Sequence, residues 1–230
     1  MIPKKLHYVW WGKPLSDTEK EWMETSKKNN PTLEHKIWTN EDVEQCKFLE
    51  VAIKEEKYAY AADYIRFWVL FNHGGIYIDT DVELTKKIPD SWLEYDTILP
   101  KETEHELGGH FIGSRKKNIF TKKMIDKYKS FTGETIDIDE WVIPNHIKET
   151  SIKTFGLYSI RNLHNGTFKS SQRLKILDVS EMCPYYPWDK DRIYKKVSIE
   201  NSIGIHYWNT YKKINKFKLN SYSSKHFDNE

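Results

Sequence analysis

The sequence predicts an α/β fold in which helices pack on an open sheet. β-prone and helical segments alternate through the first 81 residues, in the order strand, helix, strand, helix, helix, strand. The last of these strands, residues 76–78, is apolar and leads directly into Asp79-Thr80-Asp81. The 230 residues suffice for one domain with a sizeable core, and no internal repeat or linker divides them.

The first elements follow from local signals. Residues 6–11 are β-prone and stop at a Gly-Lys-Pro sequence, which predicts a strand that ends in a loop. Ser16 and Glu19 have the spacing of a capping box, which predicts a helix running to about Asn29. Residues 35–39 resemble a second short strand.

Thr39 or Asn40 can cap a helix over roughly 41–47. A stronger helix is expected from about Tyr58 to Asn72, because one face recurs at helical spacing. That face carries Ala59, Ala62, Asp63, Arg66 and Leu70. Gly74-Gly75 then predicts a helix C-cap followed by a tight turn, which fixes where the strand over 76–78 begins.

Fewer signals mark the second half of the chain. We expect strands over 97–99 and 109–113 and a helix with a basic face over 118–128. Residues 157–187 mix short strands with loops, and residues 203–208 are β-prone. The tail from Lys212 is rich in lysine and serine, which is typical of a surface helix or a partly disordered segment.

Composition excludes several functional classes. The net charge of +2, from 36 basic and 34 acidic residues, gives no long-range attraction for nucleic acid. Cys46 and Cys183 lack metal-type spacing and are expected as free thiols. The N-terminus lacks the pattern of a signal peptide, and no apolar run has the length of a membrane span. A cytoplasmic protein is expected, at most in peripheral contact with the inner face of the plasma membrane.

The acidic pair Asp79 and Asp81 carries the predicted chemistry. In an extended segment, residues two apart point to the same side, so both carboxylates would lie together. The end of an internal strand is where open α/β sheets bind ligands. Two adjacent carboxylates repel unless a positive charge lies between them, and Mn²⁺ or Mg²⁺ prefers such oxygen ligands.

Asp63 and Arg66 lie three residues apart on one helical face. An exposed ion pair is one interpretation, and it would contribute only about a few tenths of a kcal/mol. The other is an arginine oriented by an aspartate to hold a diphosphate or a sugar hydroxyl. His206 would join this site only if the chain returns it to the two aspartates.

Four ordered motifs resemble the family 32 glycosyltransferases, which include initiating mannosyltransferase-like and capsular-polysaccharide enzymes, and the catalytic domain of the clostridial glucosylating toxins. They are residues 2–10, residues 30–31 with 37–38, residues 62–66 and residues 74–81. Residues 205–211 are similar to the closing His-rich motif of that family, with Thr210 in place of Ser and Tyr211 in place of Trp.

The resemblance implies a GT-A fold, a nucleotide-diphosphate sugar donor, Mn²⁺ or Mg²⁺, and retention of anomeric configuration. It implies that Val9 and Trp10 hold the base, and that Asp79, Asp81 and His206 form the metal site. Asp79, Asp81 and Arg66 are the implied catalytic residues. The other implied donor contacts are Asp63, Arg66, Tyr77, Asp79, Thr80, Thr210 and Tyr211.

The function expected from the sequence is therefore transfer of a hexose, with a UDP-hexose favoured, to a saccharide or lipid-linked acceptor in bacterial surface polysaccharide synthesis. Residues 1–95 would bind the nucleotide sugar, 96–211 the acceptor, and 212–230 would be a basic tail. A GDP-mannose-using mannosyltransferase, a metal-dependent phosphotransferase and a non-catalytic carbohydrate-binding protein are the alternatives.

For retention of anomeric configuration, a carboxylate nucleophile is one route, with candidates Glu102, Glu104, Glu106, Asp139 and Glu140. Same-face substitution, which needs no such residue, is favoured.

Overall fold

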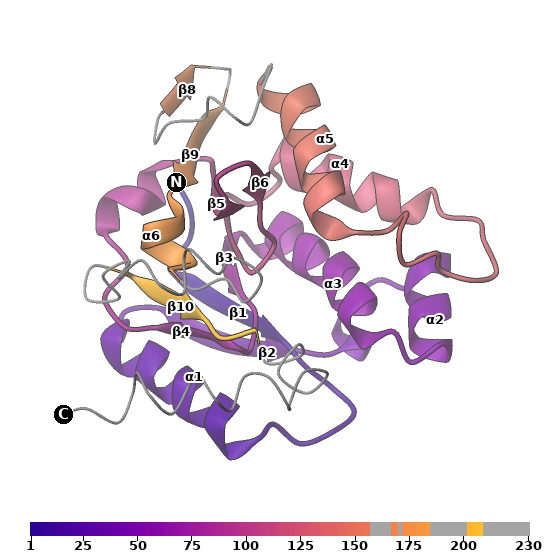
Figure 1. The fold of residues 1–230 in the computed structure, drawn as a ribbon, viewed down its shortest axis with the longest axis horizontal. Coiled ribbons are helices and arrows are strands. Elements are labelled where there is room, and N and C mark those ends of the chain that lie inside the picture. The colour runs from indigo at the N-terminus through magenta and orange to yellow at the C-terminus, as the bar shows by residue number, and fades with distance from the viewer. Residues whose placement is uncertain (157–166, 170–171, 185–201, 209–230) are drawn as a thin grey trace.

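A mixed sheet of eight strands forms the centre of the protein in the computed structural model, which describes residues 1–156, 167–169, 172–184 and 202–208 (Figure 1). The strand order is β2-β1-β3-β7-β5-β9-β8, with β6 paired to β5. The strands are β1 (Lys5–Val9), β2 (Glu34–Trp38), β3 (Gly75–Ile78), β5 (Thr97–Thr103), β6 (Glu106–Leu107), β7 (Phe111–Ser114), β8 (Thr167–Lys169) and β9 (Arg173–Leu177).

The sheet contains both parallel and antiparallel strand pairs. β1 is parallel to both β2 and β3, whereas β7 is antiparallel to its neighbours β3 and β5. A second sheet of two antiparallel strands joins β4 (Val82–Leu84) to β10 (Gly204–His206). The carboxyl ends of β1 and β3 therefore lie at one edge, and the β4–β10 ribbon begins just beyond the end of β3.

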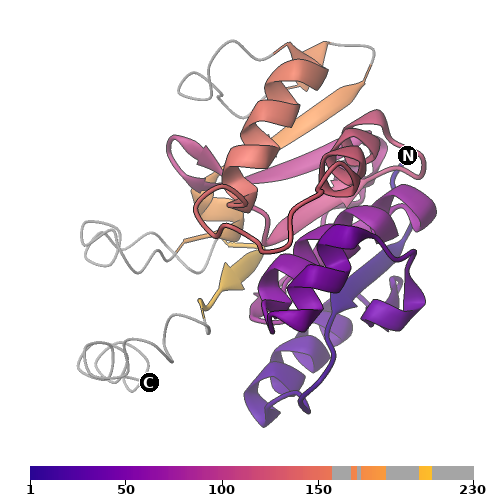
Figure 2. The same cartoon turned by 90° about the vertical axis from the view of Figure 1, so that its right-hand side faces the viewer.

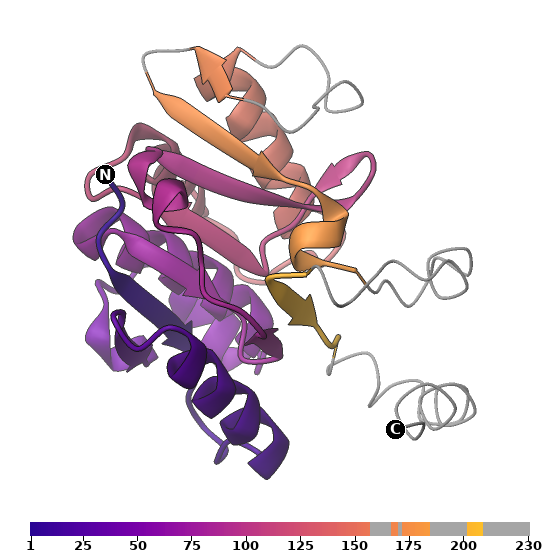
Figure 3. The same cartoon turned by 90° about the vertical axis from the view of Figure 1, so that its left-hand side faces the viewer.

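Helices cover both faces of the large sheet, which Figures 2 and 3 show from opposite sides, with α5 in front of β9 in one view and behind it in the other. The group α2, α3, α4 and α5 packs together on one face, and α1 packs against β4 on the other. The helices are α1 (Asp17–Asn29), η1 (Asn40–Asp42), α2 (Lys47–Lys54), α3 (Tyr58–His73), η2 (Asp90–Glu94), α4 (Ile119–Lys129), α5 (Ile143–Phe155) and α6 (Val179–Met182).

Two apolar clusters fill the space between these layers. Alternation along the strands assigns side chains to them, because successive residues of a strand point to opposite faces. Ile76 and Ile78 of β3 belong to the cluster on the α1 side, whereas Tyr77 between them belongs to the cluster under α3. The side on which Tyr77 points is the side from which α3 approaches the end of β3.

The predicted α/β class is confirmed, and most predicted elements lie within two residues of those observed. The capping box of Ser16 and Glu19 starts α1, and Asn118 caps α4. The helix expected over roughly 41–47 is wrong: Thr39 caps only the short η1, and α2 begins at Lys47. Residues 43–46 are not helical, since the backbone is extended at Val43 and Cys46, and Val43 is buried.

Two further observations bear on the sequence expectations. Among the residues that the structure describes, no helix is both long enough and apolar enough to cross a bilayer. Cys46 and Cys183 are not joined in a disulfide, and the first is half-buried whereas the second is fully buried.

His7 ties the first motif to the end of α3. Its Nε2 donates to the carbonyl oxygen of Gly74 at 2.7 Å, and its Nδ1 accepts from Trp38 Nε1 at 3.1 Å. The ring is therefore neutral, and burial lowers the pKa of His7 to about 4. These two hydrogen bonds fix the turn before β3, the strand that leads to the acidic pair.

Replacing Gly74 by alanine should destabilise the protein by about 3 kcal/mol. Gly74 has φ +64° and ψ −174°, a conformation nearly restricted to glycine, and a Cβ would lie 2.7 Å from the backbone nitrogen of Lys116. Gly156, which caps α5 at φ +68° with open space around it, is the matched control. Gly156→Ala should lose only about 1 kcal/mol in urea unfolding, and equal losses for the two variants would contradict this account.

Folding stability should fall as the pH falls from about 6.5 toward about 4. In this range His7 is protonated in the unfolded chain but stays neutral in the folded protein. The contribution of His7 is complete above its unfolded pKa and decreases by up to about 3 kcal/mol across this range. Urea titrations at several pH values should show that the free energy of unfolding depends less steeply on pH in His7→Gln than in the wild type. The other titratable groups are the same in the two proteins. Parallel curves would refute the assignment.

Candidate active site

The site lies at the edge where β1 and β3 end. Val9 is the last residue of β1, and Trp10 continues beside Trp38, whose carbonyl oxygen accepts from the Trp10 backbone nitrogen at 2.9 Å. The Trp10 indole donates to Lys13 O at 2.6 Å, so the loop that follows holds the ring in place. Since β3 is the parallel neighbour of β1, Asp79 emerges at the same edge as Val9 and Trp10.

Asp79 to Asp81 form a turn between β3 and β4, in which Val82 N donates to Asp79 O at 3.0 Å. The extended conformation expected for this segment is wrong, because β4 leaves the large sheet to pair with β10 and the chain must reverse. The proximity expected of the two carboxylates is nevertheless present. One oxygen of each lies within 4.8 Å of the other and of a His206 nitrogen.

The chain returns His206 to the acidic pair. Within the β4–β10 ribbon, His206 pairs in register with Val82, and Tyr207 N donates to Asp81 O at 2.9 Å. His206 Nε2 consequently lies 3.3 Å from Asp81 Oδ1. Burial lowers the pKa of this imidazole, but the Asp81 carboxylate outweighs it, and the pKa rises to about 10.

Arg66 fixes Asp79 from the other side. It forms ion pairs with Asp63 at 2.7 Å and with Asp79 at 3.3 Å. Its guanidinium also donates to Gly109 O at 2.7 Å and lies over the Tyr77 ring, whose hydroxyl donates to Asp79 Oδ1 at 2.5 Å. The interpretation of Asp63 and Arg66 as an exposed helical pair is wrong, because they are only 7% and 5% exposed.

Electrostatics hold this group together. Burial raises the pKa of Asp63, and the neighbouring Arg66 cation opposes that rise. Asp79, Asp63 and the Tyr77 ring raise the pKa of Arg66 against burial, so it is charged at any working pH. Most of its guanidinium contacts are taken by protein groups, so in this arrangement Arg66 chiefly positions Asp79.

The remaining predicted site residues divide into two groups. Thr80 lies half-buried in the turn between the two aspartates. Thr210 and Tyr211 lie outside the described residues, so their donor contacts stay predictions. Trp208, two positions after His206, has φ +56° and packs on that imidazole at 4.0 Å between ring centroids.

The side chains of the acidic turn fit a divalent cation. Asp79 and Asp81 retain 26% and 13% of their side-chain exposure, so the turn is open on one side. Carboxylate oxygens with an imidazole nitrogen form a donor set that suits Mn²⁺. The imidazolium of His206 supplies positive charge beside Asp81, and a bound cation would take over that role.

His110 is a residue that sequence reasoning missed. It precedes β7, its carbonyl oxygen accepts from Asp79 N at 3.0 Å, and its ring stacks on His206 at 4.7 Å. Burial lowers the pKa of His110 well below its usual range. No local pattern marks it, because its importance follows from the antiparallel pairing of β7 with β3, which brings residues 109–110 to the end of β3.

The chain is similar in sequence to known glycosyltransferases. Residues 16–103 match the family described as a glycosyltransferase sugar-binding region containing a DXD motif. Inositol phosphoceramide mannosyltransferase 3 of Schizosaccharomyces pombe is 23% identical over 56% of this chain and 38% of its own length. An uncharacterised glycosyltransferase of Acanthamoeba polyphaga mimivirus is 27% identical over 53% of this chain and 47% of its own.

A mannosyl phosphorylinositol ceramide synthase of Saccharomyces cerevisiae is 26% identical over 63% of this chain and 38% of its own length. The chain thus spans less than half of the length of these relatives. The PaToxG glycosyltransferase structure superposes with a TM-score of 0.56 at 19% identity, covering 66% of this chain and 69% of that one. The predicted GT-A fold and the resemblance to glycosyltransferases with an Asp-x-Asp region are confirmed.

Removing the Arg66 cation should destabilise the fold by about 3–5 kcal/mol, because Asp63 would remain buried and unpaired. Urea unfolding of Arg66→Met measures this loss. Lys87→Met is the matched control, since Lys87 forms an exposed pair with Asp90 and should change stability by less than about 1 kcal/mol.

The stability lost in Arg66→Met should be partly restored in the double variant Arg66→Met/Asp63→Asn, because the buried Asp63 carboxylate is also removed. A double-mutant cycle gives the coupling between the two residues. Additive losses would mean that the pair contributes nothing beyond the packing of its side chains.

Proposed function

We propose that this chain, whose residues 16–103 match a glycosyltransferase sugar-binding region, is a metal-dependent retaining glycosyltransferase. It moves a hexose from a nucleotide-diphosphate sugar to a saccharide acceptor. The observation that carries the proposal is the convergence of Asp79, Asp81 and His206 at the sheet edge where β1 ends at Val9, just before Trp10.

Each residue has a role that its position supports. Trp10, held by its indole hydrogen bond to Lys13, offers a flat face for the base next to Val9. Asp79 is oriented by Arg66 and Tyr77, and Asp81 by the β4–β10 ribbon. Asp63 acts through Arg66, while Thr80, Thr210 and Tyr211 belong to the donor contacts that the resemblance implies.

Asp79, Asp81 and His206 would hold the cation, Mn²⁺ or Mg²⁺. When bound, it supplies positive charge for the diphosphate as it leaves the sugar. The protein's own contribution is to fix both carboxylates before the donor arrives: Arg66 prevents Asp79 from swinging away, and Tyr207 N holds the backbone of Asp81. Such preorganisation lowers the cost of charge separation in the transition state.

Retention is proposed to occur by same-face substitution, in which the acceptor attacks as the diphosphate departs. The alternative needs a carboxylate nucleophile on the far side of the sugar. Of the five candidates, Glu102 lies on β5, Glu104 and Glu106 in the β5–β6 hairpin, and Asp139 and Glu140 before α5. All but Glu102 are exposed, whereas the acidic turn is half-buried.

The donor is proposed to be a UDP-hexose, because residues 2–10 resemble the motif of the glucosylating toxins. GDP-mannose is the second candidate, since two of the relatives are named for mannosyl transfer to inositol phosphoceramide. Those names also support a lipid-linked acceptor. Synthesis of a bacterial surface polysaccharide, with residues 96–211 forming the acceptor half, remains part of the proposal.

One donor in a panel of nucleotide sugars should stabilise the protein in the presence of Mn²⁺ and be hydrolysed slowly. Ligand at about 100 times its Kd would stabilise by about 2.7 kcal/mol, which thermal melting detects. Asp81→Asn should abolish both effects and lower hydrolysis by about 100-fold or more, because it removes a carboxylate that holds the cation. Asp90→Asn, at an exposed ion pair away from the turn, is the matched control.

Hydrolysis that continues unchanged in chelator would overturn the metal dependence. If no nucleotide sugar raises the melting temperature with or without Mn²⁺, the acidic pair is not a donor site, and a non-catalytic carbohydrate-binding protein becomes the better account. Binding of the nucleotide with phosphoryl transfer but no sugar transfer would instead favour a phosphotransferase.

A further inference from the structure

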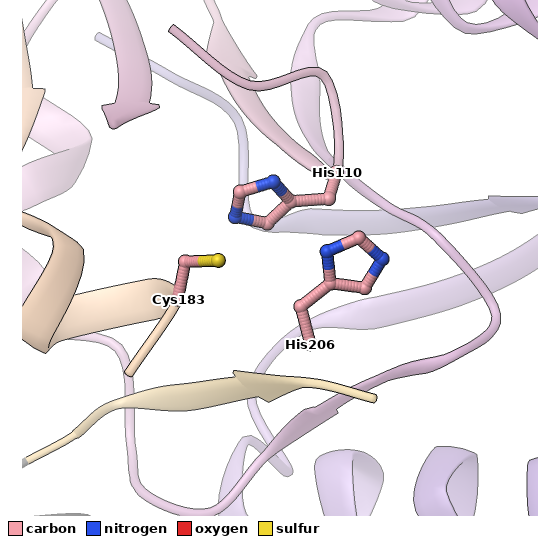
Figure 4. A group of neighbouring side chains, drawn as sticks. All are labelled: His110, Cys183 and His206. Carbon is pink, nitrogen blue, oxygen red and sulfur yellow. The ribbon is translucent and has the colours of Figure 1, made fainter. Parts of the chain in front are cut away.

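A second group of potential metal ligands shares His206 with the acidic turn and lies on the other side of that ring from Asp81. It consists of His110, Cys183 and His206, which are 3%, 0% and 7% exposed. One ligand atom from each lies within 4.8 Å of the other two. Figure 4 shows the Cys183 thiol pointing toward the two imidazole rings.

The nitrogens of this group lack partners. Both ring nitrogens of His110 and the Nδ1 of His206 are buried without a hydrogen-bond partner among the described residues. A buried polar atom left without a partner is unfavourable, so three such atoms at one place need an explanation. A cation bound by one nitrogen of His110 and by His206 Nδ1 would account for two of the three atoms.

The two ring nitrogens of His206 face different neighbours. Nε2 faces Asp81 at 3.3 Å, so the imidazole presents Nδ1, the other nitrogen, to the interior. His206 can therefore contact a ligand beside His110 and Cys183 through Nδ1 without giving up its place next to the acidic turn.

Glycines create the room for this arrangement. A Cβ at Gly108 would lie 2.6 Å from His110 Nδ1, and a Cβ at Gly204 would lie 2.6 Å from Met182 Cε. Gly204 thus allows the end of α6, with Cys183 directly after it, to approach β10. The approach is secured by Ile203 N, which donates to Glu181 O at 2.9 Å.

We propose that His110, Cys183 and His206 bind a thiophilic divalent cation such as Zn²⁺, at a site distinct from the oxygen-rich pair Asp79 and Asp81. One sulfur and two imidazole nitrogens are a donor set that Zn²⁺ accepts in tetrahedral sites with an open fourth position. Thiolate is a soft ligand that Mn²⁺ and Mg²⁺ do not favour, so the two sites select different ions. Binding releases two protons to solvent, the thiol proton of Cys183 and one ring proton of the His206 imidazolium, and each imidazole then contributes one nitrogen lone pair.

Co²⁺ provides a direct test, because a cobalt–thiolate bond gives an intense near-ultraviolet charge-transfer band and a tetrahedral site gives visible absorption. Titration of reduced, chelator-treated protein with Co²⁺ should produce both, saturating at one ion per chain, and Zn²⁺ should remove them. Cys183→Ser should abolish the charge-transfer band, and the matched control Cys46→Ser should retain it. Asp79→Asn should also retain it, because the acidic turn contributes no sulfur.

A wild-type titration that gives no charge-transfer band would overturn the proposal, as would a band that survives in Cys183→Ser or disappears in Cys46→Ser. Circular dichroism and the melting temperature of each variant show whether it is folded. If Cys183→Ser unfolds, His110→Asn replaces it, and it should lower Co²⁺ affinity by at least about 10-fold. This readout is independent of sugar transfer, so its failure leaves the proposed glycosyltransferase activity untouched.

Discussion

The position of Arg66 between Asp63 and Asp79 is the constraint on which the site depends. The cation comes from α3, and the second of its carboxylates comes from the turn after β3, so one buried ion-pair network joins a helix to a strand end. Burying these charges would be unfavourable if any member lacked a partner. The Gly109 carbonyl and the Tyr77 ring and hydroxyl complete the network. The conformation of the acidic turn is thus set before any ligand is present.

The β4–β10 ribbon applies a second constraint from the opposite end of the chain. Its pairing brings Tyr207 and His206 against Asp81, and the Tyr207 hydroxyl donates to Glu83 across 124 residues of sequence. Asp79 and Asp81 are therefore held by different parts of the protein. Distortion of either part would separate the carboxylates, which is why a site of three adjacent residues requires nearly the whole fold.

Local chemistry made the first half of the fold predictable. The capping box at Ser16, the helix that ends at Gly74 and the apolar strand before Asp79 each need only neighbouring residues to identify them. The helix placed over 41–47 failed because the cap at Thr39 is genuine but leads only into η1, and tertiary packing of the buried Val43 then decides the path. A local cap signal does not determine the length of the helix that follows it.

The site was predictable only where its residues are close in sequence or belong to a recognised motif. Asp63 and Arg66 could be paired from their spacing, but their burial depends on the packing of α3 against α4 and the sheet. His110 and Cys183 gave no signal, because their relation to His206 arises from the antiparallel pairing of β7 and from the contact of α6 with β10. Contacts of this kind depend on the topology rather than on any short pattern.

His206 links the electrostatics of the two candidate metal sites. Without a cation, its imidazolium supplies the positive charge that the buried Asp81 carboxylate requires. A divalent cation held by Asp79 and Asp81 would repel that imidazolium, so its binding and the protonation of His206 are alternatives. The neutral ring then has a lone pair on one of its two nitrogens, and which one depends on the neighbour that orients it. The side chains of His110 and Cys183, which lie on the inner side of His206, therefore bear directly on the charge balance of the acidic turn.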